Sequence, residues 1–370
     1  MNFQNIQSFL KKGLCKVKKS LQIGSAIIGI IVGAGFASGQ EILQFFSSFG
    51  YIGIAGSILA AILFAFLGMN LAQLGSRLQT TSHKDVIYHI CGRYLGVFVD
   101  IIITFFLFGV TVVMFSGAGA IFEEQFGLPS IVGSLFMAAI TIASVTLNVQ
   151  KIIGLISAVT PFLLVMVIII AGYSLLHFDP STINMDAAVA KASPAASNWV
   201  LGALLYVSYN IAAGVSMITV IGGTVKNQKV AGWGGIIGGL GLGLLILLIN
   251  ISMLTQIDTI SGVAMPMITL ANEIHPVIGF IMALVLIGMI YNTAVAMLYA
   301  FSARVVKPEK SSFKSFTILF GIIAFIASFV GFVKLVGTVY PVTGYLGFLL
   351  IAAIIVSWIL YKSKSSKVYV

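Results

Sequence analysis

The chain has 370 residues, of which 59% are hydrophobic and only 8% are charged, whereas about a quarter of a typical soluble domain is charged. A mean hydropathy of +1.11 also excludes a soluble globule and predicts a protein with many membrane-spanning helices. The excess of 20 Lys and Arg over 10 Asp and Glu does not indicate a nucleic-acid partner, because the basic residues lie between apolar runs. The sequence lacks the patterns typical of hydrolases, zinc enzymes and nucleotide-binding loops, so we expect neither an enzyme nor a bound cofactor.

Ten apolar runs are each long enough to cross a bilayer core of about 30 Å, which takes roughly 20 residues per helix. In chain order they are Leu21–Phe46, Tyr51–Leu74, Leu95–Phe122, Ile131–Leu147, Ile152–Leu176, Trp199–Ile221, Trp233–Leu254, Val277–Phe301, Phe316–Val333 and Val342–Tyr361. The strict alternation of a membrane β-barrel is absent, so each run is predicted to be a helix. The fold class is therefore predicted to be all-α and integral to the membrane.

The basic residues predict the orientation of these helices. With the N-terminus inside, 18 of the 20 Lys and Arg residues lie in cytoplasmic segments, and only Lys191 and Lys334 lie outside. This asymmetry agrees with the positive-inside rule and places both termini in the cytoplasm. The predicted divisions are a basic N-terminal segment (1–20), a first five-helix repeat (21–176), an external linker (177–198), a second five-helix repeat (199–361) and a cytoplasmic tail (362–370). The outer segment Ser261–Pro276 is moderately apolar and is interpreted as either a surface-lying helix or an ordinary loop.

The two five-helix halves enter the membrane with opposite polarity, so a similarity between them is an inverted-topology repeat, a plan common among secondary transporters. Val32–Gly39 in the first helix matches Val207–Gly214 in the sixth at the same place in each half. The glycines at positions 33, 35 and 39 weaken the first helix, because each costs about 1 kcal/mol relative to alanine. An unwound stretch leaves backbone N–H and C=O groups free to bind a solute and a cation. We therefore predict that helices 1 and 6 are broken; close helix packing at the glycines is the alternative.

The predicted solute site consists of the broken segment of the first helix and two polar residues of the sixth. Its members are Gly33, Ala34, Gly35, Phe36, Ala37, Ser38, Gly39, Tyr209 and Asn210. Interhelical hydrogen bonding is the alternative role for the last two. Glu41 is the only acidic residue well inside a span, and a carboxylate there is a candidate for binding a proton, a cation or a solute amine. The alternatives for Glu41 are a solvated outer vestibule or a role in capping the start of the half-helix. Asp100 is expected to extend its side chain to the inner membrane interface. The seven glycines of 232–243 are expected to allow close helix packing rather than to bind a nucleotide.

The segment Gly33–Glu41 reads GAGFASGQE. It resembles the signature of the YkvI-type bacterial membrane proteins, which lie within the amino acid–polyamine–organocation superfamily and have the LeuT-type fold. The resemblance extends over essentially the whole chain. It implies a bacterial cytoplasmic-membrane protein with a five-plus-five inverted repeat and a site between helices 1, 3, 6 and 8.

The same resemblance suggests a sodium site. Asn292 and Thr293 fall where sodium-coupled LeuT-type transporters place two hydroxyl side chains that ligate the ion. Backbone carbonyls near Gly33 and Phe36 would complete an oxygen shell, although one hydroxyl is replaced by an amide. Bridging between helices, or a bond from Thr293 to its own helix, is the alternative.

From these features we expect a secondary transporter that moves a small organic solute with Na⁺ or H⁺ by alternating access. Amino acids are the first substrate to consider, by analogy with the superfamily. A non-transporting sensor that retains the fold is the alternative. A channel is disfavoured because the sequence shows no carbonyl filter or ring of charges. The expected partners are the solute and the lipid bilayer, without nucleic acid, and the sequence does not determine the oligomeric state.

Overall fold

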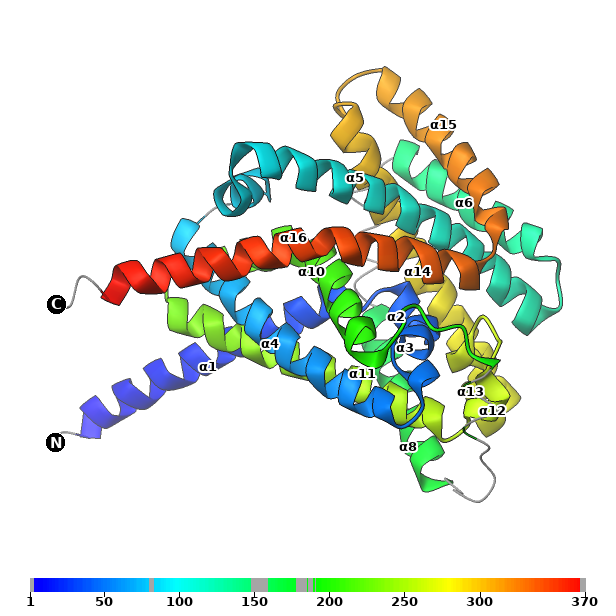
Figure 1. Cartoon of the computed structure of the whole chain (residues 1–370), viewed down its shortest axis with the longest axis horizontal. Coiled ribbons are helices and arrows are strands. Elements are labelled where there is room, and N and C mark those ends of the chain that lie inside the picture. The colour runs from blue at the N-terminus through cyan, green and yellow to red at the C-terminus, as the bar shows by residue number, and fades with distance from the viewer. Residues whose placement is uncertain are drawn as a thin grey trace.

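The computed structural model describes residues 3–79, 83–147, 159–177, 185, 189 and 191–366. The regular elements within these ranges are helices (Figure 1). They are α1 (Phe3–Ile31), α2 (Ala34–Ser38), α3 (Gln40–Phe45), η1 (Ser47–Phe49), α4 (Ile52–Leu78), α5 (His83–Phe126), α6 (Ser130–Leu147), α8 (Val159–Leu176), α10 (Trp199–Gly223), α11 (Gln228–Leu254), α12 (Ile257–Ile260), α13 (Pro266–Ile274), α14 (Pro276–Val305), α15 (Ser312–Ala327), η4 (Ser328–Val330) and α16 (Phe332–Ser366).

Seven helices in the described part of the chain are long and apolar enough to cross a membrane. They lie in α4, α5, α10, α11, α14, α15 with η4, and α16. The shorter apolar helices α6 and α8 fall on the fourth and fifth predicted runs. The start of the fifth run (152–158), half of the predicted external linker and the chain ends (1–2 and 367–370) lie outside the described residues. The chain is a multi-pass membrane protein, as its composition predicts.

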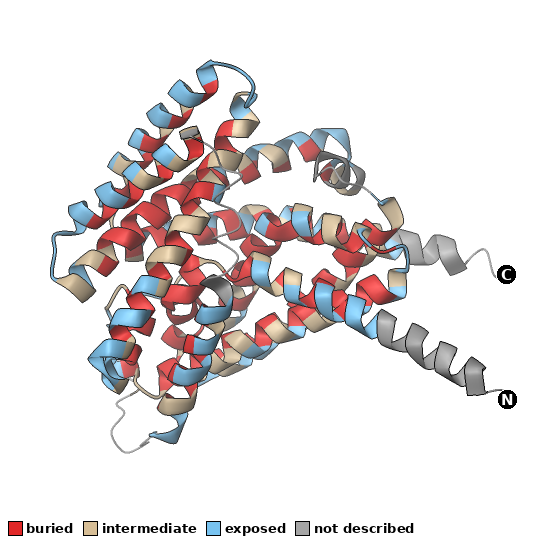
Figure 2. Cartoon of the chain, turned by 180° about the vertical axis from the view of Figure 1, so that it is seen from behind, coloured by how far each residue is buried: buried red, intermediate tan, exposed pale blue. Residues whose placement is uncertain are grey.

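The helices form two groups that meet around α10, α14 and α16. Helices α1, α4, α10 and α11 pack together, and α5, α6, α14 and α15 form the second group, with α16 in contact with both α10 and α5. In Figure 1 the described ends of α1 and α16 lie on the same side of the molecule. The inward faces of the helices are buried and their outward faces are exposed (Figure 2). Large apolar side chains such as Ile168 and Ile326 are about 60% exposed on these outward faces, as expected where a helix faces lipid.

The first predicted span is interrupted. Helix α1 ends at Ile31 and α2 begins at Ala34, so Val32 and Gly33 separate two helical pieces. A second interruption follows at Gly39, whose φ of 83° is left-handed and therefore favours glycine. Both interruptions occur in the segment where the density of glycines predicts a weakened helix.

The predicted break in the sixth span is wrong for this structure, because α10 is a continuous helix of 25 residues. Where the first span has Gly33 and Gly35, the matching positions of α10 hold Ser208 and Asn210. These residues cost a helix less than glycine does, and the Asn210 side chain donates to the Tyr206 carbonyl one turn earlier (2.9 Å). The matched position in the two halves is therefore not accompanied by a matched distortion.

The glycine-rich start of α11 packs helices together, as predicted. Gly235, Gly239 and Gly243 form one stripe against α4, where a β-carbon on Gly239 would lie 2.3 Å from the backbone nitrogen of Ala65. Gly234 and Gly238 form a second stripe against α1. Because side chains are missing along both stripes, the three backbones approach closely.

Several predicted boundaries differ from the structure. Helix α16 begins at Phe332, ten residues before the predicted start of the last span, and continues through Pro341. The preceding span ends instead at Gly331, where a φ of 98° reverses the chain. Polar residues near Lys334 lower the local hydropathy, and this hides the first turns of α16 in the sequence.

The outer segment Ser261–Pro276 contains a helix, α13, as the first interpretation of this segment predicts, but the helix is not surface-lying. Its residues Pro266, Met267, Ile268, Leu270 and Ala271 are buried, and α13 contacts α2 and α14. The carboxylate of Glu124 at the end of α5 fixes the entry to α13 by accepting from the backbone N–H of Ala264 (2.7 Å) and of Met265 (3.0 Å). The segment therefore covers the interrupted first span.

Asp100 is paired with a basic residue of another helix. It forms an ion pair with Arg304 of α14, and both side chains are partly exposed. The pair joins α5 to α14 at the end where α14 finishes. Asp100 therefore pairs with a basic residue far along the chain while remaining partly exposed.

Candidate functional site

A cavity of about 260 Å³ lies between the interrupted first span, α5, α10, α14 and α16. Its lining residues come from distant parts of the chain: Gly29, Ile30, Ile31, Val32, Gly33, Ala34, Gly35, Glu41, Phe106, Val110, Met114, Tyr209, Asn210, Ala213, Gly214, Met217, Met289, Asn292, Thr293, Ala296, Met297 and Tyr340. The structure thus brings together most of the predicted solute residues, the predicted ion residues Asn292 and Thr293, and Glu41 around one space.

Backbone from the interruption forms part of the cavity wall. The first hydrogen bond of α2 runs from the Ala37 N–H to the Gly33 carbonyl (2.9 Å). The N–H groups that precede Ala37 in α2 have no acceptor within their own helix, as at the start of any helix. Gly33, Ala34 and Gly35 all line the cavity, so exposed backbone occurs where it faces a cavity rather than lipid.

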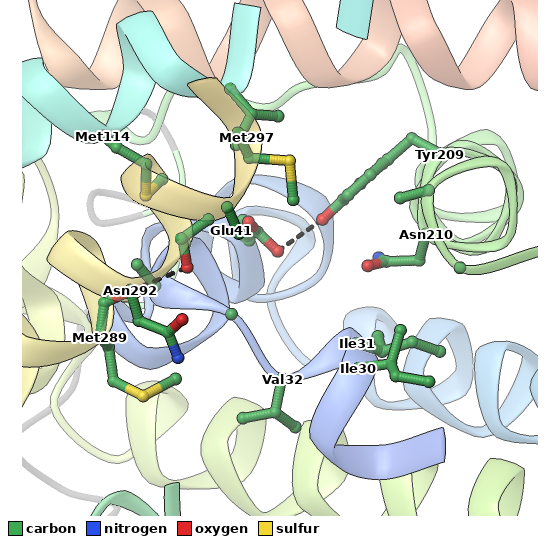
Figure 3. Close-up of a pocket in the computed structure, with 18 of the residues that line it drawn as sticks. Ile30, Ile31, Val32, Glu41, Met114, Tyr209, Asn210, Met289, Asn292 and Met297 are labelled. Atoms are coloured by element: carbon green, nitrogen blue, oxygen red, sulfur yellow. Dashed lines mark hydrogen bonds between the residues drawn. The ribbon is translucent and has the colours of Figure 1, made fainter. Parts of the chain in front are cut away.

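Glu41 ends the cavity on one side. Glu41 is only 6% exposed, and its Oε2 accepts a hydrogen bond of 2.5 Å from the Tyr209 hydroxyl (Figure 3). The rings of Tyr209 and Tyr340 stack with their centroids 4.8 Å apart, and both residues line the cavity together with Glu41. The carboxylate therefore links α3 to α10 inside the protein, and the stacked ring of Tyr340 brings α16 to the same place.

The polar residues of α10 and α14 face the same space. In Figure 3 the amide groups of Asn210 and Asn292 extend from opposite sides into the region below Glu41. The Thr293 hydroxyl donates to the Met289 carbonyl of its own helix (3.0 Å). A bond of this kind within the helix is one of the alternatives to ion binding for Thr293. Thr293 also lies next to the interruption, since a β-carbon on Gly33 would be 3.9 Å from its Oγ1.

Four of the predicted solute residues do not line the cavity. Phe36 and Ala37 are buried in the core, and the Ser38 hydroxyl donates to the Gly35 carbonyl (2.8 Å). Gly39 packs against Met267 of α13. These residues shape the interruption rather than facing the space beside it.

The two carbonyls predicted to ligate a cation are already engaged in backbone hydrogen bonds. The Gly33 carbonyl accepts from Ala37, and the Phe36 carbonyl accepts from Gly39 at 3.1 Å. A carbonyl has a second lone pair, but Phe36 lies away from the cavity wall. A cation beside Thr293 would therefore find Gly33 and Asn292 within the cavity lining, and not Phe36.

The cavity is closed at one end and open at the other. Beyond Glu41, Phe45, Phe46 and Tyr206 are completely buried, and the ring of Tyr206 lies 5.6 Å from that of Phe45 and 5.0 Å from that of Phe46. At the opposite end, the lining residues Gly29, Ala213 and Ala296 are exposed. The opening lies toward the end where α10 and α14 finish, which is the predicted cytoplasmic side.

No protein-family model matches the chain. Two Bacillus subtilis (strain 168) proteins are similar over nearly its whole length. The uncharacterized membrane protein YkvI is 28% identical over 339 residues, which cover 90% of this chain and 94% of YkvI. The uncharacterized protein YyaD is 27% identical over 344 residues, covering 91% of this chain and 96% of YyaD. The resemblance to YkvI-type membrane proteins predicted from the sequence is confirmed.

Solved transporter structures superpose on most of the chain at low sequence identity. A mutant of the manganese transporter of Eremococcus coleocola matches with a TM-score of 0.61 and 14% identity, covering 91% of this chain and 78% of that one. MhsT in complex with L-phenylalanine matches with a TM-score of 0.60 and 17% sequence identity, and the match covers 88% of this chain and 86% of MhsT. The inward-facing conformation of Mhp1 matches with a TM-score of 0.55 and 14% sequence identity, and the match covers 90% of this chain and 73% of Mhp1. The chain has the LeuT-type fold.

Within this fold, the sequence did not indicate several cavity residues. Tyr340 was not predicted, because nothing near it in sequence distinguishes it from the other aromatic residues of an apolar run. The same holds for the cavity methionines Met114, Met217, Met289 and Met297, since methionine in a membrane helix usually packs against other helices or lipid. Only their convergence on Glu41 and the interrupted span identifies them.

Proposed function

We propose that the protein is a secondary transporter of the cytoplasmic membrane that moves a small organic solute by alternating access, coupled to a cation. The single observation that carries this proposal is the cavity at the interrupted first span, where Glu41, Asn210 and Asn292 converge from three separate helices. The transporter folds that superpose on the chain support the same class.

The proposed topology has ten spans in a five-plus-five inverted repeat. The interrupted first span, the seven long apolar helices and the two shorter ones α6 and α8 together make ten. An even number agrees with the described ends of α1 and α16 lying on one side of the molecule, and the basic residues favour the cytoplasm for that side. The interruption occurs in only one of the two halves.

The asymmetric cavity supports alternating access. One end is sealed by the buried aromatic cluster of Phe45, Phe46 and Tyr206, and the other is open. In the proposed orientation this is an inward-facing state. Opening the outer side requires the bond between Glu41 and Tyr209 to break, because it joins α3 to α10 across the closed end.

Two coupling ions are compatible with the site. A proton would be carried by Glu41, the acidic side chain on the cavity wall. A sodium ion would lie between Gly33, Asn292 and Thr293, although no carboxylate lines that part of the cavity. Amino acids are the first solutes to test, because the superfamily resemblance suggests them and MhsT, which shares the fold, was solved with L-phenylalanine.

Uptake by purified protein in proteoliposomes tests the proposal. A panel of radiolabelled amino acids and amines is offered under an imposed Na⁺ gradient or pH gradient. We expect gradient-driven accumulation of one solute class. Glu41→Gln should abolish this accumulation or its dependence on pH, whereas Glu123→Gln, an exposed acid outside the cavity, should not. Specific binding without accumulation under any gradient would favour the sensor alternative.

A further inference from the structure

The cavity is lined by an acidic side chain but by no basic one. Of its lining residues, Glu41 is the only one with an ionisable acidic or basic side chain, and no lysine, arginine or histidine lies among them. The Glu41 carboxylate accepts a hydrogen bond from the Tyr209 hydroxyl, which carries no positive charge. A buried carboxylate without a cationic partner is costly, so a positively charged ligand group would find a complementary partner here, and a negatively charged group would not.

The space beside the interruption is already filled by this carboxylate. A β-carbon on Gly35 would lie only 1.8 Å from Oε1 of Glu41 and 2.7 Å from its carboxyl carbon. The acid therefore lies directly against the exposed backbone of the broken span. A ligand carboxylate placed against the same backbone would lie next to Glu41, and two carboxylates that share a site repel each other.

The rest of the cavity suits an apolar body of limited size. Its volume of about 260 Å³ corresponds to roughly nine water molecules at about 30 Å³ each. The ring of Phe106 lies 6.4 Å from that of Tyr209 and 6.3 Å from that of Tyr340, so three aromatic rings form one cluster on the wall of the cavity that Glu41 also lines. Such rings also attract an ammonium group through their faces. Four methionines provide adaptable apolar surface: Met114, Met217, Met289 and Met297.

We infer, on the basis of the proposed transport function, that the solute is an organic amine: an ammonium group on a small apolar body, without a carboxylate. The ammonium binds the carboxylate of Glu41 at the closed end of the cavity. The apolar body extends among the methionines toward the open end, and the amides of Asn210 and Asn292 flank it. Amino acids are then poor ligands, because their carboxylate has no cationic partner among the cavity residues.

Matched pairs of probes test this inference. Each pair consists of an amino acid and the amine that lacks its carboxylate: L-phenylalanine with 2-phenylethylamine, and L-leucine with isoamylamine. Binding to the purified full-length protein in detergent is measured by calorimetry, and stabilisation by thermal melting should rise with ligand concentration as RT ln(1 + [L]/Kd). The parent, Glu41→Gln and Glu123→Gln proteins are compared, so that partition of the amines into detergent appears equally in all three.

We expect at least one amine to bind the parent at least tenfold more tightly than its amino acid. Glu41→Gln should weaken that binding at least tenfold, and Glu123→Gln should leave it unchanged. Tighter binding of the amino acids, amine binding that survives Glu41→Gln, or no binding of either amine would overturn the inference. Uptake in proteoliposomes separates the two proposals. Accumulation of an amino acid would uphold transport and refute the amine, whereas Glu41-dependent amine binding without flux would uphold the ligand class and refute transport.

Discussion

Replacing Gly35 with alanine would place a methyl group against the carboxylate of Glu41. The added β-carbon would lie 1.8 Å from Oε1, whereas ordinary contact begins near 3.4 Å. The carboxylate would therefore have to move by about 1.6 Å. Because its bond to Tyr209 is already short at 2.5 Å, a movement of this size in a packed interior would break the bond. Hydrogen bonds to charged groups contribute about 1.5–3 kcal/mol, so we expect Gly35→Ala to lower the free energy of unfolding by about that amount.

Gly33→Ala, two residues earlier, is the matched control. The nearest atoms to its added β-carbon would be 3.9 Å away, and the φ of −105° and ψ of −172° at Gly33 form an extended backbone that alanine adopts without strain. Restriction of the unfolded chain should make this substitution neutral or stabilising by about 0.4–1 kcal/mol. Both changes replace glycine by alanine near the same interruption, and the contacts with Glu41 and with the Tyr340 hydroxyl (3.1 Å) occur only at Gly35.

Thermal melting of the purified variants in detergent provides the assay, combined with a double-mutant cycle. Gly35→Ala should lower the melting temperature by several degrees in the parent but have little effect in a Glu41→Ala background, where the clashing group is absent. An equal loss in both backgrounds, or a loss for Gly33→Ala as large as that for Gly35→Ala, would refute the reasoning.

Three further predictions concern the ion, the packing and the topology. Thr293→Ala should raise the Na⁺ concentration for half-maximal uptake several-fold with little change in melting temperature; equal uptake by the parent in choline and sodium buffers would exclude sodium coupling. Gly239→Leu should destabilise the protein by about 1–3 kcal/mol or more through overpacking, since its β-carbon would lie 2.3 Å from a backbone nitrogen of α4. Gly172→Ala, with no atom within 4 Å, should melt like the parent. In a background without the two native cysteines, an impermeant thiol reagent applied to intact cells should label a cysteine at the exposed position Ser130 but not one at Ser312; the reverse pattern would contradict the proposed orientation.

The interruption of the first span could be predicted from the sequence, because the cost of glycine in a helix is a local property. The break predicted in the sixth span was based instead on its match to the first span, and that prediction is wrong for this structure. There, α10 remains continuous although its position in the second half corresponds to that of the first span. Similarity between Val207–Gly214 and Val32–Gly39 concerns apolar character, whereas continuity depends on the backbone preference of each residue. Gly214 is the only glycine of the matched segment in α10.

The sequence by itself determined that the chain is a helical membrane protein, since hydrophobicity, the distribution of basic residues and glycine content act within a single segment. It also identified Glu41 as an unusual residue, because a carboxylate inside an apolar run is costly wherever the run packs. Only the tertiary structure decided which groups surround this carboxylate. Tyr209 lies 168 residues away in sequence, Tyr340 is further still, and Asp100 finds Arg304 in the same manner. Contacts over such separations depend on how whole helices pack against one another, and the composition of each helix does not specify that packing.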